Sequence, residues 1–73
     1  MTTYEKEEIK NQMMQLERMG FENMYEFDTI KVFASANNFN ELSTCIDERL
    51  MQYIDCACEL EREQKFNRRA IAN

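Results

Sequence analysis

Apolar residues recur at helical spacing in the first third of the chain. The clearest of them lie four and three positions apart, which places them on one face of a helix, and are Ile9, Met13 and Leu16. Thr2 and Glu5 have the spacing of a capping box, in which each side chain accepts a hydrogen bond from a backbone N–H at the helix start. The pattern therefore predicts a first helix over residues 3–19.

The single glycine of the chain marks the end of this helix. Gly20 can adopt the left-handed backbone conformation that commonly follows the last helical residue. Phe21 would then be the next residue, and in a Schellman arrangement that residue contacts the position occupied by Leu16. The sequence predicts such a helix end, with Phe21 packed on Leu16.

A second apolar segment follows, and its apolar residues cover most of a helix circumference. They are Met24, Tyr25, Phe27, Ile30, Val32, Phe33, Ala34 and Ala36. We expect a helix over residues 24–36, with Asn23 as its N-cap and Glu26 in the capping-box position. Because a helix that is apolar on most sides is normally buried, this one is predicted to be the most buried of the chain.

The remaining sequence contains neither glycine nor proline. Asn38 and Glu41 again have capping-box spacing, and they predict a third helix over residues 39–67, about 42 Å long at 1.5 Å per residue. Its length exceeds that of the first two helices, so its end is expected to project. The predicted fold is all-α: one small domain, residues 1–73, with three helices and a long C-terminal helix.

The third predicted helix carries an apolar stripe with heptad spacing. A stripe of this kind on a projecting helix requires a covering surface. We therefore predict a partner interface, used by another protein or by a second copy in a homodimer, at Ile46, Leu50, Tyr53, Ile54, Ala57 and Leu60. The alternative is that a longer first helix folds alongside the stripe and covers it within one chain.

Charge limits the class of partner. The chain has a net charge of −5, with 14 acidic residues against nine Lys and Arg. Domains that bind nucleic acid are usually basic, because phosphate contacts dominate their affinity, so we expect no direct nucleic-acid contact. No apolar run reaches the roughly 18 residues of a membrane-spanning helix, so no membrane partner is expected.

Three cysteines and no histidine leave little basis for metal, cofactor or catalytic chemistry. Cys56 and Cys58 would point about 200° apart on a helix, which does not suit zinc. No histidine is available as a base near neutral pH, so we expect no catalytic residue, no cofactor and no enzymatic activity. The charged N-terminal sequence does not resemble a signal peptide, which predicts reduced cysteines and a cytoplasmic location.

Residues 13–51 resemble a ubiquitin-associated (UBA) domain. The likeness rests on Met19-Gly20-Phe21 after the first helix, on the asparagine pair at 37–38, and on Cys45-Ile46 and Leu50-Met51. In that family the MGF loop and the end of the third helix form the ubiquitin-binding surface. The resemblance implies a three-helix fold and a ubiquitin-binding surface at Met19, Gly20, Phe21, Leu50 and Met51.

These observations predict a small acidic regulatory or adaptor protein that acts by protein–protein interaction and self-associates through its C-terminal helix. One alternative is a UBA-like ubiquitin-binding module. Another is an acidic inhibitor that occupies the basic groove of a nucleic-acid-binding protein, with carboxylates in the place of phosphates.

Overall fold

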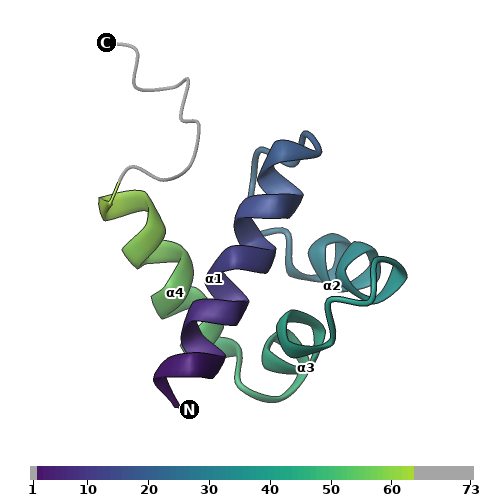
Figure 1. Cartoon of the computed structure of the whole chain (residues 1–73). Helices are drawn as coiled ribbons and strands as arrows, with labels where there is room; N and C mark the ends of the chain where they lie inside the picture. Colours follow the sequence, from purple (N-terminus) through teal and green to yellow (C-terminus); the bar gives the residue numbers. More distant parts are fainter. Residues whose placement is uncertain (1, 64–73) are drawn as a thin grey trace, which may run out of the picture.

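A computed structural model describes residues 2–63 of the chain, and these residues form four helices and no strand (Figure 1). The helices are α1 (Thr3–Arg18), α2 (Phe27–Ala36), α3 (Asn40–Glu48) and α4 (Leu50–Arg62). The all-α prediction is confirmed. The predicted arrangement of three helices differs from the observed one, because the third predicted helix is divided at Arg49.

The two ends of α1 form as their residues predict. The Thr2 Oγ1 accepts from the Glu5 N–H and the Glu5 Oε1 accepts from the Thr2 N–H, both at 3.1 Å, which completes the capping box. At the other end Gly20 has a φ of 110°. The Phe21 N–H donates to the Leu16 carbonyl at 3.3 Å, the long bond of a Schellman motif.

The start of α2 was predicted three residues too early. The Asn23 side chain accepts from the Tyr25 N–H at 2.9 Å and forms a local turn instead of capping a helix. Turns of this kind compete with helix formation, and α2 begins only at Phe27. Its predicted end at Ala36 is confirmed. A second Schellman motif follows it, with Asn38 in the left-handed conformation at a φ of 62°.

The predicted capping box of Asn38 and Glu41 does not form, because Asn38 is occupied in the preceding turn and Phe39 takes the N-cap position without a side-chain hydrogen bond. Gln12 of α1 replaces the missing cap. Its Oε1 accepts from the Leu42 N–H at 3.0 Å, and its Nε2 donates to the Glu41 carboxylate at 2.9 Å. The start of α3 is thus completed by a residue 30 positions away in the sequence.

The break between α3 and α4 lies at Arg49, whose φ of −139° and ψ of 55° are not helical. The change of direction brings α4 back alongside α1, and the two helices run in the same direction in Figure 1. Residues 64–67, which the third predicted helix included, lie outside the described residues.

One hydrophobic core holds the helices together. Its members are Ile9, Met13, Leu16, Met24, Ile30, Ala34, Leu42, Cys45, Ile46, Tyr53, Cys56, Ala57 and Leu60. The prediction that the second helix is the most buried is wrong, since α2 buries only Ile30 and Ala34. Within residues 2–63, no helix combines the length and the apolar character needed to cross a membrane.

Candidate functional site

The apolar stripe of the third predicted helix lies mostly inside the chain. Tyr53 and Ala57 are fully buried, Leu60 is 2% exposed and Ile46 is 7% exposed. The predicted partner interface is therefore not available at these four residues in this fold, and the alternative of cover within one chain is the observed arrangement. For the three residues of α4, the physical reason is the break at Arg49, which turns α4 back onto α1.

Ion pairs fasten α4 to α1 along one edge of this stripe. The Glu59 carboxylate lies 2.7 Å from Lys6 Nζ and 3.2 Å from Lys10 Nζ, and Lys10 Nζ also lies 3.5 Å from the Glu63 carboxylate. Hydrogen bonds from Lys6 and Lys10 lower the pKa of Glu59. These charged groups have a structural role between the two helices.

Tyr53 is the polar centre of the core, which the stripe pattern does not reveal. Its hydroxyl donates to the Met24 carbonyl at 2.6 Å, and its ring meets the Phe27 ring edge-on with centroids 5.9 Å apart. Burial raises the pKa of the Tyr53 hydroxyl. The side chain therefore connects α4 to the segment that precedes α2 and is not available to an external ligand.

The residues of the expected ubiquitin-type surface are not brought together. Met19, Gly20 and Phe21 follow the C-terminal end of α1, whereas Leu50 and Met51 begin α4 near the N-terminal end of α1 (Figure 1). Met19 is 52% exposed and Met51 is 71% exposed, but each belongs to a different end of the molecule. The surface that the UBA resemblance implies is thus divided in two.

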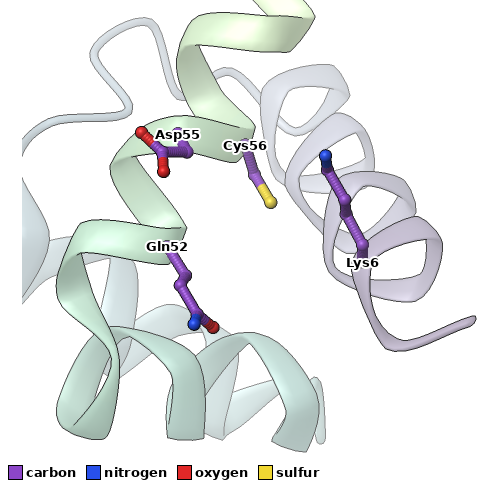
Figure 2. Close-up of a pocket in the computed structure, with 4 residues that line it drawn as sticks. All are labelled: Lys6, Gln52, Asp55 and Cys56. Carbon is purple, nitrogen blue, oxygen red and sulfur yellow. The ribbon is translucent and has the colours of Figure 1, made fainter. Parts of the chain in front are cut away.

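An open hollow lies between α1 and α4, with a volume of about 210 Å³ (Figure 2). It is lined by Lys6, Gln52, Asp55 and Cys56. Figure 2 shows the Cys56 thiol pointing from α4 toward α1. Burial raises the pKa of this thiol, and a thiol that stays protonated at neutral pH is a weak nucleophile. The hollow therefore offers poor conditions for covalent chemistry.

Metal ligands do not gather elsewhere in the described part of the chain. Among residues 2–63, no group of three or more Cys, Asp or Glu side chains could hold a metal ion. Cys45, the second buried cysteine, also has a raised pKa because of burial.

The most distinctive surface feature is one side of α2, which we call the α2 outer face. Its exposed residues lie at adjacent or i, i+4 positions and are Asp28, Thr29, Val32, Phe33 and Ala36. Val32 is 63% exposed and Phe33 is 44% exposed.

The Phe33 ring contacts Phe21 edge-on, with centroids 4.7 Å apart, so the apolar surface continues from α2 onto the turn after α1. Sequence reasoning missed this face because it assigned the apolar residues of the second helix to the core. The signal that could have found it is the distribution of those residues around the whole helix, since a short helix in a small domain can bury only one side.

A smaller apolar group lies at the start of α4. Leu50 is 36% exposed and Met51 is 71% exposed, and Ile54, one turn further on, is partly buried against the core. Leu50 and Ile54 are the two predicted interface residues that keep part of their surface outside the core.

No family model matches the chain, and no curated protein or solved structure matches it either.

Proposed function

We propose that this protein is a small acidic adaptor or regulatory protein without enzymatic activity, and that it binds another protein through the α2 outer face. The observation that carries this proposal is the exposure of Val32 and Phe33 on the most apolar of the four described helices. Burying a Val or Phe side chain is worth about 1.5–3 kcal/mol relative to leaving it exposed. Covering this face with a partner would recover that free energy.

The polar groups of the interior support a binding role over a catalytic one. Gln12 caps α3, the Tyr53 hydroxyl donates to the Met24 carbonyl, and Lys10 pairs with carboxylates in α4 and at its C-cap. Each of these groups already serves the fold. A catalytic site usually contains groups whose pKa values are adjusted for proton transfer near neutral pH, whereas burial raises the pKa of the Cys45 and Cys56 thiols and keeps them protonated.

The experiment is affinity capture from extracts of the source cells with three forms of the chain. The wild-type chain is compared with Val32→Glu/Phe33→Glu and with Met51→Glu, which changes an even more exposed apolar residue elsewhere. All three are first checked for helicity by circular dichroism. We expect one bound protein to be lost only with the double variant. An identical set of bound proteins for all three forms would refute the proposal.

Self-association through α4 is a second candidate, and the exposure of Leu50 and Met51 favours it. The first turn of α4 would then meet the same turn of a second copy, as the symmetry of most homodimers requires. Light scattering over a hundredfold concentration range measures this directly. A mass of two chains that falls to one in Leu50→Glu/Met51→Glu supports it, and a monomer throughout excludes it.

Ubiquitin is the partner that the UBA resemblance suggests, and Phe21 adjoins the α2 outer face through its contact with Phe33. Binding through this half of the family surface alone would shift the amide signals of residues 19–21 when isotope-labelled protein is titrated with ubiquitin. A titration that leaves those signals in place would remove ubiquitin from the possible partners.

A further inference from the structure

The α2 outer face is apolar along one part and acidic along another, and this division indicates the kind of partner that fits it. We infer that the face binds a basic amphipathic helix, whose apolar side covers Val32 and Phe33 while Lys or Arg residues on its flank meet the carboxylates at the start of α2. This inference rests on the proposed function and specifies its partner.

The apolar part is suited to a helix. Val32 and Ala36 are one turn apart on α2, and Phe33 extends the surface sideways to Phe21, whose ring is in edge-on contact at 4.7 Å. Helix-binding surfaces commonly hold apolar anchors that recur every three or four residues, because such anchors share one face of the bound helix.

The acidic part lies at the N-terminal end of the same helix. Asp28 precedes Val32 by one turn and is exposed, and Glu26, also exposed, is the N-cap residue of α2. The one lysine of α2, Lys31, has its Nζ 2.7 Å from the Asp47 carboxylate, which offsets its charge. A partner therefore meets negative charge beside the apolar surface.

The net charge of the four-helix domain also favours a basic partner. All 14 acidic residues lie before residue 64, whereas three of the nine Lys and Arg residues, Lys65, Arg68 and Arg69, follow it. The four helices are thus strongly acidic as a body. Such a body attracts a basic partner from a distance and repels an acidic one, which favours a Lys- or Arg-rich helix over an acidic helix of equal apolar content.

The test uses two synthetic helical peptides of about 18 residues, long enough for partial helicity in water. Both carry leucines spaced three and four residues apart, and their flanks carry lysine in one and glutamate in the other. Each is titrated into isotope-labelled full-length protein at low salt. We expect the lysine peptide to shift the amide signals of Val32, Phe33 and Phe21, and to bind at least about tenfold more tightly than the glutamate peptide.

Variants of the chain separate the two parts of the face. Val32→Ser/Phe33→Ser is expected to lower the affinity for the lysine peptide at least about tenfold, because two apolar anchors are lost. Glu26→Gln/Asp28→Asn is expected to lower the affinity for the lysine peptide about two- to fivefold at low salt. It should have no effect at 0.5 M salt, where the charges are screened. Met51→Glu is the matched control and should bind as the wild type does.

Three results would overturn the inference. The first is equal binding of the two peptides, and the second is a shift centred on Leu50 and Met51 instead of the α2 outer face. The third is a shift of the Val32 and Phe33 signals in Lys65→Glu/Arg68→Glu/Arg69→Glu with no peptide added. That shift would mean that the chain itself occupies the face. If neither peptide binds while the captured protein is still lost with Val32→Glu/Phe33→Glu, only the partner class is wrong and the proposed function stands.

Discussion

Helices α4 and α2 are both rich in apolar residues, yet they bury them to different extents. α4 buries Tyr53, Cys56, Ala57 and Leu60, because α1 lies along it. α2 buries only Ile30 and Ala34 and leaves larger side chains exposed. The burial of a helix therefore depends on which elements cover it, so apolar content alone does not distinguish a core helix from one with a binding face.

The polar contacts at the edges of the two helices also differ in how far they are buried. α4 is joined to α1 by ion pairs around Lys10, whose side chain is only 10% exposed. α2 meets α3 through the exposed pair of Lys31 and Asp47 and through the Ser35 and Ser43 hydroxyls, 2.9 Å apart. One side of α2 is thus held by polar contacts at the surface, while its outer face stays uncovered.

The largest expected change in the free energy of unfolding tests the contrast between the buried side of α4 and the exposed face of α2. Leu60→Ala removes a buried side chain of α4 and should cost about 2–5 kcal/mol, because it leaves a cavity. Val32→Ala truncates an exposed side chain on α2 and should change the free energy of unfolding by no more than about 0.5 kcal/mol. Urea denaturation followed by circular dichroism measures both. Similar losses in the two variants would show that the α2 outer face is covered in solution.

A somewhat smaller effect is expected at the cap that joins α1 to α3. Gln12→Met retains an apolar stem but removes both hydrogen bonds of the amide, so the buried Leu42 N–H loses its partner. Leaving such a group unsatisfied costs about 1–3 kcal/mol. The measurement is again urea denaturation, with Gln15→Met on the exposed side of α1 as the control. Equal stability of the two variants would mean that water replaces the cap.

Tyr53→Phe isolates the polar contribution of α4 to the core. The ring and its contact with Phe27 remain, while the hydrogen bond to the Met24 carbonyl is lost. We expect a loss of about 0.5–1.5 kcal/mol in the free energy of unfolding. Amide exchange should also become faster at Met24 and Tyr25, which the bond holds against α4. Unchanged exchange there would contradict the assigned role.

The smallest expected effect on stability comes from Glu59 at the edge of α4, and it depends on pH. Hydrogen bonds from Lys6 and Lys10 lower the pKa of Glu59 below its ordinary value of 4.5 in the folded protein. A carboxylate with a lowered folded pKa stabilises the fold above its ordinary pKa, and this contribution is lost as the pH falls from about 5 through the folded value. Glu59→Gln should therefore lower the melting temperature at pH 7.

The difference between wild type and Glu59→Gln should then narrow steadily on acidification. Glu7→Gln, at an exposed position on α1, provides the control and should leave the melting temperature nearly unchanged at pH 7. A difference between Glu59→Gln and wild type that is the same at pH 7 and pH 3 would show that the charge of Glu59 contributes nothing to the joining of α4 to α1.

Features that depend on a few neighbouring residues could be predicted from the amino-acid sequence. The all-α class, the capping box at Thr2 and the Schellman motif at Gly20 all formed as predicted, because each requires only the residues within one or two turns. The end of α2 was also predictable. Its start was not, since Asn23 can form either a cap or a turn, and the burial of Met24 accompanies the turn.

Which side of each helix is available to a partner depends on the packing of the helices and could not be predicted from local sequence. The break at Arg49 has no glycine or proline to announce it, and the cap on α3 comes from Gln12, distant in the sequence. Both depend on how α1 packs against the later helices. That packing buries the α4 stripe and leaves the α2 outer face exposed, because the surface of a helix is covered only where another element lies against it.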